Sequence, residues 1–129
     1  MSLMNPKQRL QLERQYHESE DKARGDSSLI RGIYSSGLFD EAERYHLDAL
    51  GDVRGAHVLD YGCGGGWSTA KLRARRARVT GFDISRTRLA EARGHLFSGS
   101  DSSSRVDLLQ CAAEQLPFAD ATFDAVFGK

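Results

Sequence analysis

Four of the five residues that follow a short apolar run, residues 57–61 (HVLDY), are glycines, in the segment 62–66 (GCGGG). Glycine tolerates positive φ angles and lets a ligand approach the backbone closely. Where such a turn leads from a strand into a helix, the free N–H groups of the helix can bind a negative group. The position of the turn therefore favours a small-molecule binding site over a loose turn without a ligand.

The spacing of the glycines distinguishes between classes of ligand. A dinucleotide fingerprint, G-x-G-x-x-G, would place its third glycine at position 67 or 69, and these positions hold Trp67 and Thr69. A phosphate-binding loop would need a Gly-Lys-Ser/Thr sequence, which the turn lacks. A nicotinamide-dependent oxidoreductase is therefore disfavoured and stays only as a third hypothesis. The pattern that stands here joins one acid to three alternate glycines: Asp60, Gly62, Gly64 and Gly66.

The residues around the turn predict the elements that hold it. We expect strands at 57–61, 78–83, 106–110 and 123–127, and helices at 67–76 and 85–97. Ser85 is placed to cap the second of these helices, with Leu89, Ala92 and Leu96 on one face. Alternating strands and helices predict an α/β fold with a parallel sheet, whose ligands bind beyond the carboxyl ends of the strands.

The first 55 residues have a different pattern. We expect an exposed polar helix at 6–23, a short second helix capped by Asp26 or Ser27 that carries Tyr34, and a third helix at 39–50. Residues 1–3 resemble an expression scar and are excluded from fold reasoning. The expected domains are thus an N-terminal helical segment at 4–55 and a core at 56–129.

Composition excludes several classes of protein. The chain has 129 residues, 40% hydrophobic, which supports one domain with a modest core. Its 18 Lys+Arg balance 18 Asp+Glu, so no nucleic-acid partner is expected. No apolar run approaches the roughly 18–20 residues of a membrane span, and the N-terminus has no secretion pattern. We therefore expect a cytoplasmic protein without a membrane partner.

The two cysteines indicate neither a metal site nor a disulfide scaffold. Cys63 and Cys111 stand outside any CxxC pair and without a paired histidine. We expect both to be reduced, small, semi-buried packing residues, and no metal.

Three separated segments resemble the class I S-adenosylmethionine-dependent methyltransferases, and more narrowly the small-molecule branch that includes the ubiquinone and menaquinone biosynthesis methyltransferases. They are residues 58–66 (VLDYGCGGG), residues 81–85 (GFDIS), and residues 113–118 (AEQLPF) leading to 123–127 (FDAVF). The resemblance covers residues 56–129. It implies a Rossmann-like fold with strand order 3-2-1-4, S-adenosylmethionine as cofactor with S-adenosylhomocysteine as product, and methyl transfer to a small-molecule acceptor.

The same resemblance implies roles for the residues of the turn. Gly62, Gly64 and Gly66 are implied to form the floor under the methionine part of the cofactor, and Cys63 belongs to the same set. Asp60 is implied to meet the cofactor's amino group, directly or through water, by a charge-assisted hydrogen bond.

The resemblance assigns the nucleoside part of the cofactor to the next two strand ends. Asp83 is implied to accept hydrogen bonds from both ribose hydroxyls. For Asp60 and Asp83 alike, the alternative is a role as a helix cap or in a solvated turn. Ile84 is implied to pack on the adenine, with an ordinary core role as an equal alternative. Ala113 is implied to offer a backbone N–H to the adenine edge. The family often has an acid where Ala112 stands, so one adenine hydrogen bond, worth about 0.5–1.5 kcal/mol, is expected to be missing.

Other groups could contribute to the chemistry but have simpler interpretations. Tyr34 and Phe39 are candidates for a lid on the methionine end, against simple helix packing. None of His46, His57 and His95 has an identifiable partner at the strand ends, and His95 is expected to lie away from the crevice, so no catalytic residue is assigned. One basic run is expected to be the solvated face of a helix rather than a phosphate site: Lys71, Arg73, Arg75, Arg76 and Arg78.

The fourth strand is expected to form an open apolar edge. The family resembled here has a seven-stranded sheet, whereas this sequence supplies four strands, so a C-terminally incomplete core is expected. We expect pairing through the exposed edge, as a homodimer. Two function hypotheses follow: the cofactor-binding portion of a small-molecule methyltransferase, or a non-catalytic metabolite-binding or interaction module.

Overall fold

A four-stranded parallel sheet forms the centre of the molecule. The computed structural model describes residues 5–24, 37–99 and 105–128. The strands are β1 (His57–Tyr61), β2 (Arg78–Asp83), β3 (Val106–Gln110) and β4 (Ala125–Gly128), in the order β3-β2-β1-β4. This order confirms the α/β prediction. Because the chain runs outward from β1 in both directions, the topological switch lies between β1 and β4.

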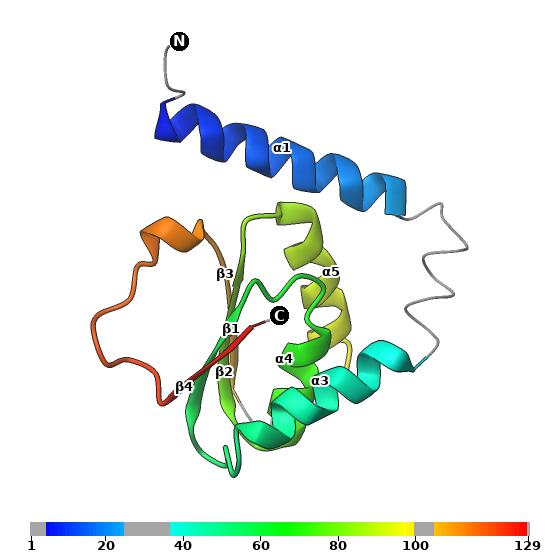
Figure 1. Cartoon of the computed structure of the whole chain (residues 1–129), viewed down its shortest axis with the longest axis vertical. Helices are drawn as coiled ribbons and strands as arrows, with labels where there is room; N and C mark the ends of the chain where they lie inside the picture. Colours follow the sequence, from blue (N-terminus) through cyan, green and yellow to red (C-terminus); the bar gives the residue numbers. More distant parts are fainter. Residues whose placement is uncertain (1–4, 25–36, 100–104, 129) are drawn as a thin grey trace.

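Helices lie mainly on one side of this sheet. They are α1 (Pro6–Arg24), α3 (Leu38–Ala49), α4 (Trp67–Ala74) and α5 (Arg86–Phe97), with a 3-10 turn, η1 (Ala113–Gln115), after β3. Figure 1 shows α3, α4 and α5 on one face, the segment after β3 on the other, and α1 across the end of the sheet where β3 leads into η1. Among the described residues, no helix is long and apolar enough to cross a bilayer. The short helix predicted after Asp26, with Tyr34, lies outside the described residues.

The predicted boundaries differ from the structure by two residues at the end of α4 and at the start of β4, and by a single residue at the ends of α1, α3 and β4. The helix predicted at 67–76 ends at Ala74, because Arg76 adopts a left-handed φ of 63° that a helix cannot continue. The strand predicted at 123–127 begins at Ala125 instead. There the Asp124 carboxylate, rather than a backbone carbonyl, accepts the N–H of His57 at 2.8 Å. Both two-residue differences are tertiary effects.

The main core fills the space between the sheet and the helices. Val58, Val79 and Phe127, from three strands, pack with Leu47 of α3 and Leu72 of α4. Further along the sheet, the predicted apolar face of α5 is confirmed, since all three of its members are buried: Leu89, Ala92 and Leu96. Ser85 caps α5 as expected by accepting the N–H of Arg88.

The opposite face of the sheet is covered by aromatic packing. The ring of His57 packs against Phe123 with centroids 4.5 Å apart, and Phe123 packs against Phe118. The Nε2 atom of His57 lies 2.9 Å from the hydroxyl of Thr80. His57 thus contributes to packing between the strands and the covering segment.

The prediction that the basic run forms a solvated face is wrong for three of its members. Lys71 pairs with Asp40 and Glu43 of α3, and the hydrogen bond to Glu43 is the main cause that raises the pKa of Lys71. Arg75 donates to the carbonyl of Leu47 at 2.9 Å. These side chains hold α3 against α4. Arg73 instead donates to a carbonyl of α5, and only the last two members of the run are exposed: Arg76 and Arg78.

Candidate functional site

The glycine-rich turn, residues 62–66, joins β1 to α4 at the carboxyl edge of the sheet and is tied to β2. The N–H of Cys63 donates to the carbonyl of Phe82 at 2.8 Å, and the N–H of Gly64 donates to the Asp83 carboxylate at 2.9 Å. The alternate glycines all have left-handed φ angles, of 69°, 51° and 80° at Gly62, Gly64 and Gly66. The turn is therefore a fixed shelf rather than a loose connection.

Gly66 also permits a close approach between helices. A Cβ atom built there would lie 3.0 Å from the Cβ of Ala92 and 3.0 Å from a methyl group of Leu96. Helix α5 therefore packs directly over the start of α4. Dinucleotide-binding turns use their third glycine for close packing, and here Gly66 provides it at a different spacing.

Two carboxylates flank the turn. Asp60, which is 2% exposed, is the last residue but one of β1. Its side chain lies on the helix side of the sheet and accepts a hydrogen bond of 2.6 Å from the hydroxyl of Thr69 in α4. Asp83 is half-buried, and its two oxygens accept the N–H groups of Gly64 and of Ser85, at 2.9 and 2.8 Å. An ionised carboxylate has about four acceptor positions, so the backbone contacts of Asp83 leave capacity for a ligand's hydroxyl groups.

Cys63 lies near both acids, and their charges contribute to the shifted pKa of its thiol. Burial raises the pKa of its thiol from 9.0 to about 12, and the negative charges of Asp60 and Asp83 are the next largest causes. A field that opposes a thiolate favours a cation at the same place. The residues present therefore fit a ligand that carries a positive charge next to hydroxyl groups. Cys63 and Cys111 are both free thiols, as predicted.

The remaining predicted residues continue along the same edge. Ile84 is half-buried, and its carbonyl accepts a hydrogen bond from the Gln110 side chain at 3.2 Å. Ala112 is buried, whereas Ala113, which opens η1, is exposed. The structure therefore sets these residues at the ends of β2 and β3, beside Asp83. Tyr34 and the side chain of Phe39 lie outside the described residues.

Two contacts near the turn were not anticipated. His95 of α5 packs against Trp67, the first residue after the turn, with ring centroids 3.9 Å apart. Sequence reasoning also missed Thr69. Its only sequence signal is its place in the first turn of the helix that follows the glycines.

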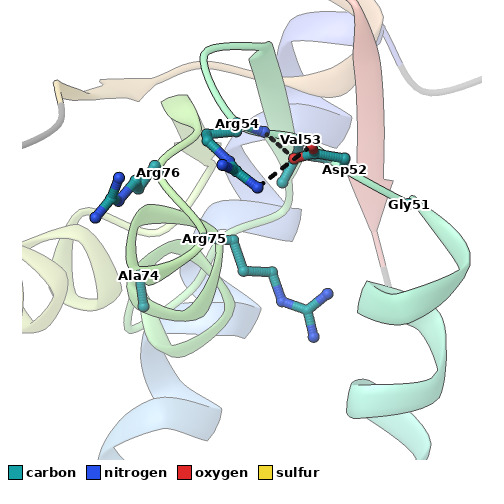
Figure 2. Close-up of a pocket in the computed structure, with 7 residues that line it drawn as sticks. All are labelled: Gly51, Asp52, Val53, Arg54, Ala74, Arg75 and Arg76. Carbon is teal, nitrogen blue, oxygen red and sulfur yellow. Dashed lines mark hydrogen bonds and ion pairs between the residues drawn. The ribbon is translucent and has the colours of Figure 1, made fainter.

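A hollow lies at the other end of the sheet. This cavity of about 460 Å³ is lined by residues 51–54 and 74–76, and Figure 2 shows its arginine side chains pointing in different directions. Arg54 pairs with Asp52 at 3.6 Å, and Arg75 reaches Asp48 at 2.6 Å. None of the predicted site residues that the structure describes lines this cavity.

Comparison with known proteins places the glycine-rich turn in a known domain. Residues 58–129 match the family described as a methyltransferase domain. The chain belongs to this family. The match begins within β1 and includes every predicted site residue except the two lid candidates, Tyr34 and Phe39. The turn with its two flanking acids is therefore part of the methyltransferase domain, whose family uses S-adenosylmethionine.

Two relatives illustrate the range of matches to this methyltransferase domain. The chain is 40% identical over 81 residues to a ubiquinone biosynthesis O-methyltransferase of Aromatoleum aromaticum, covering 62% of this chain and 33% of the relative. It is 35% identical over 108 residues to the ubiquinone/menaquinone biosynthesis C-methyltransferase UbiE of Desulfotalea psychrophila, covering 82% and 42%. The chain thus spans less than half the length of these relatives.

The fold agrees with solved methyltransferase structures. Magnesium protoporphyrin IX methyltransferase of Synechocystis PCC 6803, solved with bound SAM, superposes with a TM-score of 0.73 at 20% identity. The superposition covers 99% of this chain and 63% of that one. This likeness confirms the Rossmann-like fold that the family resemblance implied.

Proposed function

We propose that this methyltransferase domain binds S-adenosylmethionine at the carboxyl edge of its sheet and takes part in methyl transfer to a small-molecule acceptor. One observation carries the proposal: Asp60 and Asp83, acids at the carboxyl ends of neighbouring strands, flank the glycine-rich turn, with Asp60 next to the last residue of β1 and Asp83 the last of β2. Beyond this geometry, support comes from the family match and from relatives whose names place them in quinone biosynthesis.

Each residue of the site has a proposed task. Asp60 receives the cofactor's amino group, and Asp83 receives the ribose hydroxyls, as charge-assisted acceptors. The three glycines form the floor under the methionine part, with Cys63 packed beneath. The adenine lies against Ile84, and its edge meets the backbone N–H of Ala113, next to Ala112.

Orientation is the chain's main contribution to the reaction. The bound sulfonium supplies an activated methyl group, so the difficult chemistry belongs to the cofactor. The glycine shelf and its two acids fix the cofactor's position, which lowers the entropic cost of aligning an acceptor. The negative field around Cys63 favours the cationic cofactor over its neutral product.

The N-terminal helical segment, residues 4–55, is proposed to cover part of the bound cofactor at the carboxyl edge of the sheet. Helix α1 crosses that end of the sheet (Figure 1), and Arg9 pairs with Glu114 of η1. This contact lies one residue from Ala113, at the proposed adenine end. We therefore propose that α1 covers the nucleoside part rather than the methionine end.

A homodimer through β4 and a cytoplasmic location complete the proposal. β4 is the outer strand beyond β1, and Val126 on it is 58% exposed, which supports pairing through this edge. The two free thiols are in keeping with a reducing compartment. Light scattering that finds only monomers at high concentration would count against the dimer.

The alternative is a module that binds the cofactor without transferring its methyl group. Transfer of a labelled methyl group to a quinone precursor or another phenol distinguishes the two. Tight binding without transfer to any acceptor would favour the alternative.

The test of cofactor binding is calorimetric titration with S-adenosylhomocysteine. Asp83→Ala is expected to weaken binding at least tenfold, about 1.4 kcal/mol. The matched control is Asp107→Ala on β3, an acid paired with Arg105 outside the proposed site, and it is expected to leave affinity unchanged. A folded wild-type chain that does not bind would refute the proposal.

A further inference from the structure

The first turn of α4 presents two adjacent hydroxyls to two buried carboxylates. Ser68, 3% exposed, donates to Glu43 of α3, which is 6% exposed. Thr69, which is fully buried, donates to Asp60 of β1 at 2.6 Å. Both contacts join a hydroxyl to a carboxylate. The Ser68 contact joins α4 to α3, whereas the Thr69 contact joins α4 to an acid of the proposed cofactor site.

The Thr69 contact fixes the direction of an acid that a ligand must meet. An aspartate side chain can rotate about two bonds, and a short hydrogen bond to one carboxylate oxygen removes most of that freedom. Thr69 is itself β-branched and lies in a helix, so its own rotamers are restricted. A stiff donor therefore sets the orientation of Asp60 before any ligand arrives.

We propose that Thr69 is a positioning residue, which orients the Asp60 carboxylate toward the amino group of the cofactor. The inference rests on the proposed function, because it assumes that the amino group meets Asp60. Thr69 does not touch the cofactor itself. Its contribution is therefore confined to the interaction that Asp60 makes, and ligands without an amino group do not sense it.

This restriction provides the test. Two ligands are titrated calorimetrically: S-adenosylhomocysteine, and its deaminated analogue, which keeps the carboxylate and lacks the amino group. Thr69→Val removes the hydroxyl and keeps the shape. It is expected to lower affinity for S-adenosylhomocysteine at least about tenfold and to change affinity for the analogue by no more than about twofold.

Three variants serve as controls. Thr69→Ser keeps the hydroxyl and is expected to retain the preference for the amino ligand within about threefold. Ser68→Ala removes the neighbouring hydroxyl–carboxylate bond and is expected to leave the preference unchanged. If Thr69→Val does not fold by circular dichroism, Thr69→Ala, which leaves room for water, carries the same expected loss of preference.

Each outcome decides a different point. If Thr69→Val keeps the preference, or weakens both ligands equally, Thr69 only packs and the proposal is overturned. If the wild-type chain binds both ligands equally well, Asp60 does not meet the amino group, and the proposal fails while cofactor binding stands. If the folded wild-type chain binds neither ligand, the proposed function itself fails.

Discussion

The two ends of the sheet differ in what they offer a ligand. The amino-terminal end has the cavity of about 460 Å³, where Arg54 pairs with Asp52 (Figure 2) and Arg75 donates to the carbonyl of Leu47. The carboxyl end has a tight glycine shelf, two acids held by backbone and hydroxyl donors, and a thiol in their negative field. The comparison teaches that fixed backbone and oriented charge, rather than the volume of a hollow, are the features that identify the proposed site.

The largest expected difference between the two ends is the loss of stability when a glycine is replaced by alanine. Gly66→Ala forces a left-handed alanine against α5, so we expect a loss of about 2–5 kcal/mol in the free energy of unfolding. Gly55, near the other end, has a φ of 75°, and a Cβ atom there would meet nothing within 4 Å, so Gly55→Ala is expected to cost about 1–2 kcal/mol. Urea denaturation measures both. Equal losses would show that α5 does not pack closely on the shelf.

The arginines at the amino-terminal end are expected to stabilise the fold. Arg75→Gln loses the bond to the Leu47 carbonyl and is expected to lower stability by about 1–2 kcal/mol. Arg76→Gln, at an exposed neighbour, is expected to stay within about 0.5 kcal/mol. Thermal unfolding with titration of S-adenosylhomocysteine tests both variants. Lost ligand affinity in Arg75→Gln without lost stability would move the site to this end.

The thiol near the two acids gives a pH-dependent prediction. The folded-state pKa of Cys63, about 12, lies above its ordinary value of 9.0, so the unfolded chain loses the proton first. The contribution of Cys63 to the free energy of unfolding is fully present below pH 9.0. It falls as the pH rises toward about 12, by at most about 1.4 kcal/mol per pH unit.

The control for this pH dependence is Cys63→Ala, which is expected to flatten the decline relative to the wild type in alkaline urea titrations. Alkylation offers a second readout: at about pH 8 the half-buried Cys111 is expected to react before Cys63. If Cys63 reacted as fast as Cys111, its thiol would be neither buried nor opposed by neighbouring negative charges, and the account would be contradicted.

The smallest expected effect concerns the adenine end. Ala112 caps η1 with an extended backbone, a conformation that an aspartate also adopts at such positions. Ala112→Asp is expected to tighten S-adenosylhomocysteine binding by about 0.5–1.5 kcal/mol by restoring a bond to the adenine amino group. Ala119→Asp, an exposed position in the same segment, is the control. Unchanged or weaker binding in Ala112→Asp would place the adenine elsewhere.

Local patterns determined most of the fold. β1, β2 and β3 have the predicted bounds because short apolar runs lie between turn residues, and the cap at Ser85 is a local signal. The start of β4 and the bonds of Lys71 depend on partners far along the chain, which no local pattern contains. The start of β4 and the surroundings of Lys71 are therefore features that the sequence analysis predicted wrongly.

The site follows the same division. The glycine turn and its two acids could be predicted, because strand ends of a parallel sheet share one edge. Thr69 could not, since its role depends on which face of α4 meets β1. The pairing of Arg9 with Glu114 joins residues separated by most of the chain, so only the structure reveals it.

The most direct test of the central claim is to map S-adenosylhomocysteine onto the chain by its backbone amide resonances. If the carboxyl edge is the site, the amides of Gly62, Gly64 and Ala113 shift on titration, while those of Gly51, Arg54 and Arg76 stay in place. Shifts confined to the second group would place the ligand in the arginine-lined cavity and contradict the account.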